Sequence, residues 1–406
     1  MPRQTILGIF LLQVVLLSIG ITRPYELKHE DNNALHATFA RSHLKVGLRV
    51  TRAQNYYVNP QNGFGYFYPN HPPGPGLVLA LAYGITGHDG PTITRLVAIS
   101  FHVLGTWLFY GLLRRVFRRR WELVLAMFIY VVLPESAFFG RMMNHEVMAL
   151  PAAILLVRGY WESVQGSWSR RRAMAAIVTG ALWGVISGWA GFFAIAACGA
   201  HAAWEVLVRK NSRAIPSLAV LVAAPVVLFA LAIGQLLWVL GGNVEYLRTL
   251  LGSRMAGGNT GPLAWIGRIL ELHWRYFGLT SATALVAFVY RALRPKSEGS
   301  RDPAQEVGLI FLMTGAGYVA AFAHNATLHD YWQFLLLPAS AIGIVLLLRP
   351  LIDATSFATR PVLRRALLAL VVFDLFVVCT VTLVRRHVKR EGYCLQTVEW
   401  IRTHSL

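Results

Sequence analysis

The chain has 406 residues, of which 55% are hydrophobic and only 14% are charged, and its mean hydropathy is +0.50. A soluble protein could not bury so much apolar surface, so the composition excludes a soluble domain and indicates a protein that lies in lipid. The net charge of +19 does not indicate nucleic acid, because many basic residues stand in short clusters between apolar runs, such as Arg114–Arg120 and Arg209–Arg213. That distribution is typical of cytoplasmic loops facing anionic lipid.

Apolar runs recur along the whole sequence, which predicts an all-α polytopic membrane protein with about eleven spans of roughly 20 residues each. The first span, Thr5–Ile21, leads into a long external loop over residues 22–75. The next run, Gly74–Gly87, is too short to cross comfortably and is expected to be a half-inserted or tilted helix. Residues 1–384 are expected to form one integral membrane domain, and residues 385–406 a short C-terminal tail. The other expected spans are Pro91–Leu113, Trp121–Phe138, Val147–Trp161, Ala173–Ser187, Gly191–Val208, Ile215–Leu240, Tyr276–Leu293, Val307–Ala323, Tyr331–Leu348 and Ala366–Val384.

Several sets of ionisable residues fall at the ends of these spans, and the alternation of the spans places all of them on the external side. Any one set alone is explained by side chains at headgroup level that reach out to water. Their occurrence together on one side favours a functional site. The sets are Glu30 with Asp31, His71, Arg141 with His145 and Glu146, and His329 with Asp330.

The first set lies in the sequence HEDNN, at the mouth of the first span. The segment after it, Leu35–Leu48, alternates apolar and polar residues in a way that predicts an amphipathic helix along the membrane surface. Asp31 then has two interpretations that the local sequence does not separate, a cap for this helix and a catalytic base. A cap accounts for one acid but not for the pair that Asp31 makes with Glu30.

The other sets lie in equally polar surroundings. GYFYPNHPPGPG (Gly65–Gly76) is rich in proline, which predicts a stiff, non-helical loop around His71. Such a loop is either a simple rigid turn or one wall of a wet cavity, where aromatic rings and an imidazole suit a sugar and a phosphate. Arg141 and Glu146 could simply neutralise each other, and the segment His324–Pro338, with Tyr331, also fits an aromatic belt at the membrane surface.

Taken in order, these motifs resemble those of polytopic glycosyltransferases of the GT-C type. The resemblance is to the bacterial branch of the dolichyl-phosphate-mannose–protein mannosyltransferase and aminoarabinose-transferase-like superfamily, and it covers roughly Ile6 to Pro338. The motifs that carry it are the acidic pair with Ala40-Arg41 and Gly47-Leu48 after it, YPNHPP (Tyr68–Pro73), GRMMNHE (Gly140–Glu146) and HDYWQFLLLP (His329–Pro338).

The resemblance implies a GT-C-like bundle that transfers a sugar from a polyprenyl-phosphate carrier to an acceptor at the extracytoplasmic face of the plasma (inner) membrane. It assigns the base to Asp31, with Glu30 as the competitor, because many relatives have these two acids in the opposite order. A divalent metal is a possible cofactor, with ligands that the sequence does not identify. The acceptor is unknown and could be a protein, a lipid or a glycan.

The chemistry of such a donor needs one base and groups that hold the phosphate, and a single displacement would invert the anomeric centre. The segment after His71 is expected to form one wall of a groove for the isoprenoid tail. The residues expected to contact phosphate and sugar are His71, Arg141, His145, Glu146, His329 and Tyr331.

A transporter or flippase of lipid-linked glycans is the main alternative, and a polymerase or ligase of such glycans is a third. A transporter should place ionisable groups near the middle of its spans. Asp374, in the last apolar run, is one of the few such residues. A transferase should instead gather Asp31, His71 and Glu146 around one outward cavity.

Overall fold

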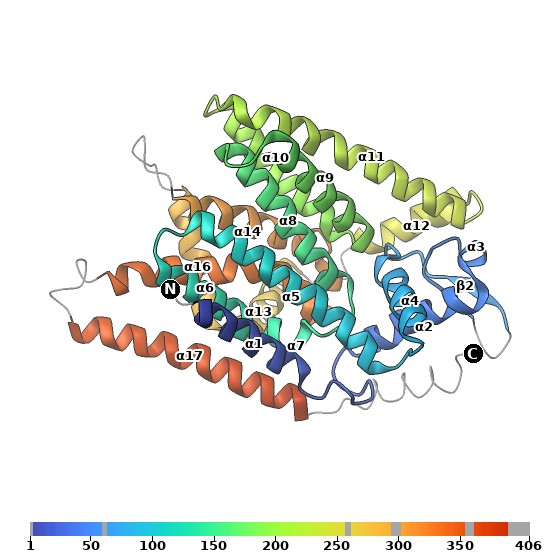
Figure 1. Cartoon of the computed structure of the whole chain (residues 1–406), viewed down its shortest axis with the longest axis horizontal. Coiled ribbons are helices and arrows are strands. Elements are labelled where there is room, and N and C mark those ends of the chain that lie inside the picture. The colour runs from blue at the N-terminus through green and yellow to red at the C-terminus, as the bar shows by residue number, and fades with distance from the viewer. Residues whose placement is uncertain (1–2, 59–62, 256–260, 294–301, 354–360, 389–406) are drawn as a thin grey trace.

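The computed structural model describes residues 3–58, 63–255, 261–293, 302–353 and 361–388, most of which are helical (Figure 1). The elements up to the middle of the chain are α1 (Arg3–Ser18), α2 (Asp31–Val46), α3 (Leu48–Thr51), β1 (Tyr56–Val58), β2 (Gly65–Phe67), α4 (Gly74–Thr86), α5 (Pro91–Val116), α6 (Arg120–Val132), α7 (Pro134–Phe139), α8 (His145–Gln165) and α9 (Arg170–Ser187). The elements that follow are α10 (Ala190–Leu207), the 3₁₀ helix η1 (Ser212–Ala214), α11 (Ile215–Val239), α12 (Val244–Met255), α13 (Pro262–Leu293), α14 (Pro303–Ala321), α15 (Ala323–Leu328), the 3₁₀ helix η2 (Asp330–Leu336), α16 (Leu337–Ile352) and α17 (Pro361–Val388).

The all-helical polytopic architecture predicted from the sequence is confirmed. Within the described residues, seven helical segments are long and apolar enough to cross a membrane. Each of the other predicted spans also lies on helical structure, but how many of the helices cross stays a prediction. The seven segments are Pro91–Val116, His145–Gln165, Ala190–Leu207, Ser212–Val239, Pro303–Ala321, Asp330–Ile352 and Pro361–Arg385.

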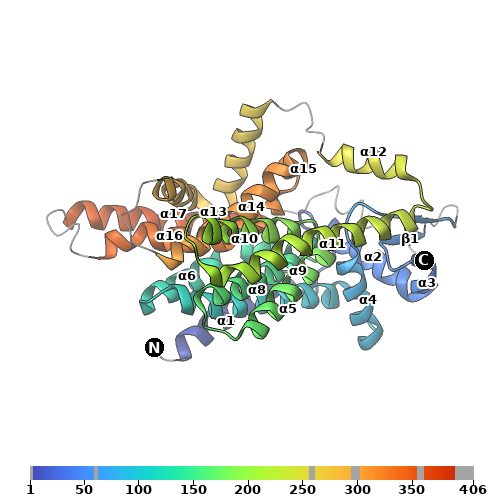
Figure 2. The same ribbon diagram turned by 90° about the horizontal axis from the view of Figure 1, so that it is seen from above.

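The first external loop forms one end of the molecule. Its elements α2, α3 and α4 and the strands gather at the end far from the N-terminus in both views (Figures 1 and 2). The predicted amphipathic helix is α2, which packs on α4, and Phe39 on its inner face is fully buried. A two-stranded antiparallel hairpin, with Tyr56 opposite Phe67, was not predicted because each strand has only three residues.

Two predicted spans are not single α-helices. The run Trp121–Phe138 divides at Leu133 into α6 and α7, because Pro134 has no backbone N–H and disfavours helical geometry in the residue before it. The run Tyr331–Leu348 begins as the 3₁₀ helix η2 and becomes α16 only at Leu337. The predicted C-terminal tail, residues 385–406, lies outside the described residues from position 389 on.

Helix α8 lies at the centre of the bundle and packs on α5, α9 and α10. Its contact with α9 depends on small residues: a Cβ atom on Gly180 would lie only 2.7 Å from the backbone nitrogen of Leu156. Close approach of this kind provides the packing that holds helices together in lipid, where no hydrophobic force acts between them. The first turn of α8, with His145 and Glu146, is thereby held at the end of the bundle where α2 packs.

Helix α13 is broken at Gly278, which has φ 81° and ψ 165°, a conformation essentially restricted to glycine. The break frees backbone N–H groups at the start of the second half of the helix. Asp374 of α17 accepts hydrogen bonds from two of them, those of Leu279 (3.3 Å) and Thr280 (2.8 Å). A carboxylate in the middle of a span could mark a transport path, but that of Asp374 instead accepts hydrogen bonds from the N–H groups that the break in α13 leaves without a partner.

We predict that Gly278→Ala lowers the free energy of unfolding by about 1–3 kcal/mol, because alanine is strained at this φ. Its Cβ would also lie 2.7 Å from the Asp374 carboxylate. Chemical denaturation in detergent measures the change. Gly267→Ala, where no atom lies within 4 Å of an added Cβ, is the matched control on the first half of the same helix. Equal stability of the two variants would contradict the prediction.

Candidate active site

A cavity of about 240 Å³ lies at one end of the bundle, where four segments distant in sequence meet. Six of the eight site residues predicted from the sequence line it: Asp31, His71, His145, Glu146, His329 and Tyr331. The two that do not are Glu30 and Arg141. The other lining residues are Asn32, Leu35, His36, Tyr68, Asn144, Asn325 and Trp332.

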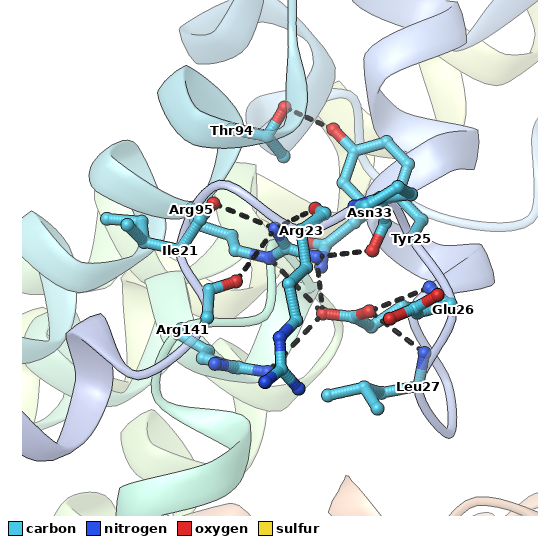
Figure 3. A network of polar contacts seen from close by, with 12 residues as sticks. Ile21, Arg23, Tyr25, Glu26, Leu27, Asn33, Thr94, Arg95 and Arg141 are labelled. Atoms are coloured by element: carbon cyan, nitrogen blue, oxygen red, sulfur yellow. Dashed lines mark hydrogen bonds and ion pairs between the residues drawn. The ribbon is translucent and has the colours of Figure 1, made fainter. Parts of the chain in front are cut away.

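Glu30 belongs to a buried ion-pair network with Arg95 and Arg141, the two arginines labelled in Figure 3 together with the surrounding first loop. Its Oε1 accepts hydrogen bonds from Arg95 Nη2 at 2.8 Å and Nε at 3.2 Å, and Arg141 Nη2 lies 3.7 Å away. Its Oε2 accepts from the backbone N–H groups of Glu26 and Leu27, both at 3.0 Å. Both oxygens of the carboxylate are therefore bound within the protein.

Arg141, a predicted phosphate contact, is instead held by this network. Besides its ion pair with Glu30, it donates to the carbonyl oxygen of Ile19 and lies over the Phe138 ring at 5.8 Å. Burial is the largest cause that lowers the pKa of Arg141 to about 10, and the Glu30 carboxylate acts in the opposite direction. The guanidinium joins the end of α1 and the first loop to the turn before α8.

The two acids of the HED sequence point in different directions, because consecutive residues at the start of a helix are rotated by about 100° around its axis. His29 has φ 60°, a left-handed conformation that is uncommon for a residue with a side chain. Its ring packs against the rings of Tyr331 and His329, with centroids 5.3 and 5.8 Å apart. After this turn Glu30 binds Arg95, whereas Asp31 begins α2 and lines the cavity.

A second ion pair attaches the first loop to η2. Asp330 is 1% exposed and accepts hydrogen bonds from Lys28 Nζ and from the Tyr276 hydroxyl group, both at 2.5 Å. Its neighbours in sequence, His329 and Tyr331, both line the cavity. The Lys28–Asp330 pair therefore connects two walls of the cavity, although neither residue lines it.

Three imidazoles form a contiguous group in the cavity. The rings of His71 and His145 are stacked with centroids 4.1 Å apart, and His36 meets His145 edge-on at 4.9 Å. His145 Nδ1 donates to the carbonyl oxygen of Ser187 at 2.7 Å, because a carbonyl can only accept, so its proton is on Nδ1. Burial, followed by the proximity of His145, holds the pKa of His36 well below its usual value.

Glu146 forms the deep wall of the cavity together with an aromatic pair. Its Oε1 accepts a hydrogen bond from the Tyr318 hydroxyl group at 2.8 Å. The Tyr318 ring stacks on Trp332 with centroids 4.8 Å apart and an interplanar angle of 11°. The sequence did not predict a role for Tyr318, because this residue lies within an apolar run. His36 and Asn144 also had no predicted role, although both lie within the motifs described above.

An apolar groove of about 300 Å³ adjoins the cavity, and His71 lines both. One wall comes from the proline-rich segment and from Leu77 of α4, and the other from α9 and α11. The expectation that the segment after His71 borders an apolar groove therefore agrees with the structure. The other lining residues are Ala53, Gln54, Pro69, Pro72, Pro73, Leu182, Val185, Ile186, Trp189, Leu228, Leu231, Ala232, Gln235 and Leu236.

In the described part of the chain, one group of side chains brings three possible metal ligands within 4.8 Å of one another: His201, Glu205 and Glu306. Both carboxylates are ion-paired with Arg209, which lies 2.8 Å from Glu306. Glu205 is at the end of α10, whereas the start of that helix is near the cavity, so the group lies at the opposite end of the bundle. The described residues that line the cavity form no such group.

Several solved structures have a similar fold. A structure of ArnT from Cupriavidus metallidurans bound to undecaprenyl phosphate superposes with a TM-score of 0.64 at 16% identity. It is matched over 91% of this chain and 64% of its own. The oligosaccharyltransferase AglB from Archaeoglobus fulgidus, in complex with an inhibitory peptide and a dolichol-phosphate, gives a TM-score of 0.59 at 14% identity. Here the match covers 95% of this chain and 56% of AglB.

The chain has the GT-C fold. The resemblance seen in the sequence motifs is thus confirmed at the level of the fold. A third structure, of the Archaeoglobus fulgidus oligosaccharyltransferase in complex with Zn and sulfate, also gives a TM-score of 0.59, at 16% identity over 96% of this chain and 53% of its own. The chain thus spans between half and two thirds of the length of these GT-C proteins. No family model matches the sequence, and no curated protein matches it.

We predict that Glu30→Ala lowers the free energy of unfolding by about 3–5 kcal/mol, because it leaves the buried guanidinium groups of Arg95 and Arg141 without their carboxylate. Asp89→Ala is the control. It removes an acid from an ion pair with Arg41 whose carboxylate is 58% exposed, and it should cost at most about 1 kcal/mol. Denaturation in detergent compares the two. If Glu30→Ala loses no more stability than Asp89→Ala, the prediction for the Glu30 ion pair is wrong.

We also predict that stability falls as the pH drops below 6.5. Burial lowers the pKa of His43 in the first loop to about 4, from an ordinary value of 6.5. The folded protein therefore binds fewer protons than the unfolded chain between these values, and stability is lost as pH falls from 6.5 to about 4. Thermal melts across this range should show a shallower decline for His43→Gln than for wild type. His88→Gln, which changes an exposed histidine, should not differ from wild type.

Proposed function

We propose that this chain is a membrane glycosyltransferase that moves a sugar from a polyprenyl-phosphate donor to an acceptor. The single observation that carries the proposal is the juxtaposition of the polar cavity, with Asp31 and four imidazoles, and the apolar groove that shares His71 with it. A donor of this class has the same two parts, an apolar chain and a polar head. The ArnT structure with a similar fold holds undecaprenyl phosphate, and that of AglB holds a dolichol-phosphate.

In this proposal the isoprenoid tail lies in the groove between the proline-rich segment and α11, and the phosphate lies where groove and cavity meet. His71 and His145 are stacked at that junction. The first turn of α8, which begins at His145, adds backbone N–H groups and the positive end of a helix dipole. Arg141 is not needed as a phosphate ligand, because it neutralises Glu30 instead.

Asp31 is proposed as the base. It removes the proton from the acceptor's nucleophilic atom while that atom bonds to the anomeric carbon of the sugar. The bond between that carbon and the phosphate oxygen breaks, and the lipid phosphate leaves with the electron pair. One displacement of this kind inverts the anomeric centre. Glu30 is a poor candidate for the same role, because both of its oxygens already accept hydrogen bonds within the protein.

No step of this proposal involves a metal. The ligands with suitable spacing, His201, Glu205 and Glu306, are at the far end of α10 and are paired with Arg209. The proposal places the cavity at the extracytoplasmic face of the plasma (inner) membrane, because the basic clusters such as Arg114–Arg120 belong to the opposite end of the bundle. The acceptor is left open among protein, lipid and glycan.

The alternative of a transporter or flippase predicts ionisable groups along a path through the middle of the bilayer. The six predicted residues that line the cavity are instead gathered at one end of the bundle, and Asp374 caps the second half of α13. These observations favour the transferase.

We predict that Asp31→Asn lowers the rate of sugar transfer by about 10²–10⁴-fold, the usual contribution of a general base. Purified protein in detergent would be given a panel of polyprenyl-phosphate sugars and candidate acceptors, and release of free lipid phosphate would be measured. The variant should still bind undecaprenyl phosphate and melt like wild type. Glu245→Gln, at an exposed acid on the external segment, is the control and should transfer normally. If Asp31→Asn transfers sugar at the wild-type rate, Asp31 is not the base.

A further inference from the structure

Two side chains at the start of α8 are buried against the cavity with unused hydrogen-bonding capacity. Asn144 and Glu146 both line the cavity and are each 1% exposed. Asn144 Oδ1 caps α8 by accepting from the backbone N–H of Val147 at 2.8 Å, which identifies Nδ2 as the remaining donor. Among the described residues, neither Asn144 Nδ2 nor Glu146 Oε2 has a hydrogen-bond partner.

An unpaired donor or acceptor that is removed from water is costly, and the cost is greater for a charged group. Here an amide donor and a carboxyl oxygen occur two residues apart, in the wall of one cavity. Hydroxyl groups satisfy both at once, since each can donate one hydrogen bond and accept others. A sugar ring carries several hydroxyl groups at fixed spacing, which suits this pair better than water alone.

The charge of the cavity restricts the sugar further. Its lining includes two carboxylates, those of Asp31 and Glu146, and no lysine or arginine. The nearby cations are engaged with other acids, Lys28 with Asp330 and Arg141 with Glu30. A carboxylate on the sugar would therefore meet like charges in a poorly solvated space, which is strongly unfavourable.

Tyr318 determines which oxygen of Glu146 is available. Its hydroxyl group donates to Oε1, which leaves Oε2 for a ligand. Its ring supports Trp332, and Trp332 lines the cavity as a flat apolar surface. Tyr318 is absent from the lining, so it acts through these two residues.

We propose that Glu146 and Asn144 select the donor sugar by its hydroxyl groups and exclude anionic sugars. One hydroxyl group donates to Glu146 Oε2, another accepts from Asn144 Nδ2, and Tyr318 is the positioning residue that orients Glu146. This inference rests on the proposed function, because it concerns the sugar of the polyprenyl-phosphate donor. The substrate class is a hydroxylated sugar without negative charge, and hexuronic acids are rejected.

The experiment compares two polyprenyl-phosphate donors that differ only at one carbon, a neutral hexose and the hexuronic acid of the same configuration. Wild type should prefer the hexose by about 100-fold or more in kcat/KM, because like charges brought together without water strongly disfavour binding of the hexuronic acid. Glu146→Gln keeps the size of the side chain and removes its charge. In Glu146→Gln the preference for the hexose over the hexuronic acid should fall to about tenfold or less. Transfer of the hexose should become slower, and transfer of the hexuronic acid should become faster.

Tyr318→Phe tests the positioning role without changing the ring that supports Trp332. It should raise KM for the neutral donor several-fold and change kcat little, because it loosens a contact made to the bound sugar. Tyr160→Phe is the matched control. Tyr160 is also buried, but its hydroxyl group binds His201 at the other end of the bundle, so its kinetics should match wild type.

Binding of undecaprenyl phosphate without a sugar separates the possible failures. Glu146→Gln should bind it as tightly as wild type, because the proposed contact is to the sugar alone. Use of the hexuronic acid by wild type as efficiently as the hexose, or an unchanged preference in Glu146→Gln, would overturn the inference and leave the proposed transferase intact. A failure of wild type to transfer any sugar from any such donor would instead refute the proposed function.

Discussion

The buried ion pair between Glu30 and the two guanidinium groups of Arg95 and Arg141 is the interaction on which the rest of the site depends. A carboxylate at this depth is tolerated only when it is paired and fully hydrogen-bonded, and Glu30 meets both conditions. Its partners come from α5 and from the turn before α8, so one acid fixes the first loop against two helices. The removal of Glu30 would leave two buried guanidinium groups without their carboxylate.

Because of this ion pair, the adjacent acids Glu30 and Asp31 have different roles. Glu30 binds the arginines, whereas Asp31, the next residue along α2, lines the cavity. Because Arg95 and Arg141 pair with Glu30, the cavity is lined by imidazoles and acidic side chains. In the function proposed above, the phosphate of the donor lies at the stacked pair of His71 and His145, and its sugar lies at the wall that Glu146 forms.

The bilayer restricts where such a site can be built. Irregular backbone at membrane depth survives only where protein or a wet cavity satisfies it. The irregular segments found here, the break between α6 and α7 and the 3₁₀ turn η2, both lie toward the end of the bundle that holds the cavity. Proline is responsible at the first, because Pro134 cannot donate a helical hydrogen bond. The break at Gly278 is different, because Asp374 satisfies the exposed N–H groups directly.

The sequence by itself determined the all-helical membrane class and the helical structure at each expected span. It also identified six of the residues that line the cavity. It could do so because hydrophobic period and span length act locally, and because the alternation of spans brings their ends to one face. Only the tertiary structure decided that Glu30 and Arg141 bind each other while Asp31 meets His71 and Glu146. The choice depends on Arg95, which belongs to a helix about 65 residues further along the chain, and on Arg141. The role of Tyr318 could not be predicted from the sequence for the same reason. A tyrosine within an apolar run has this role only because folding brings the carboxylate of Glu146 to its hydroxyl group.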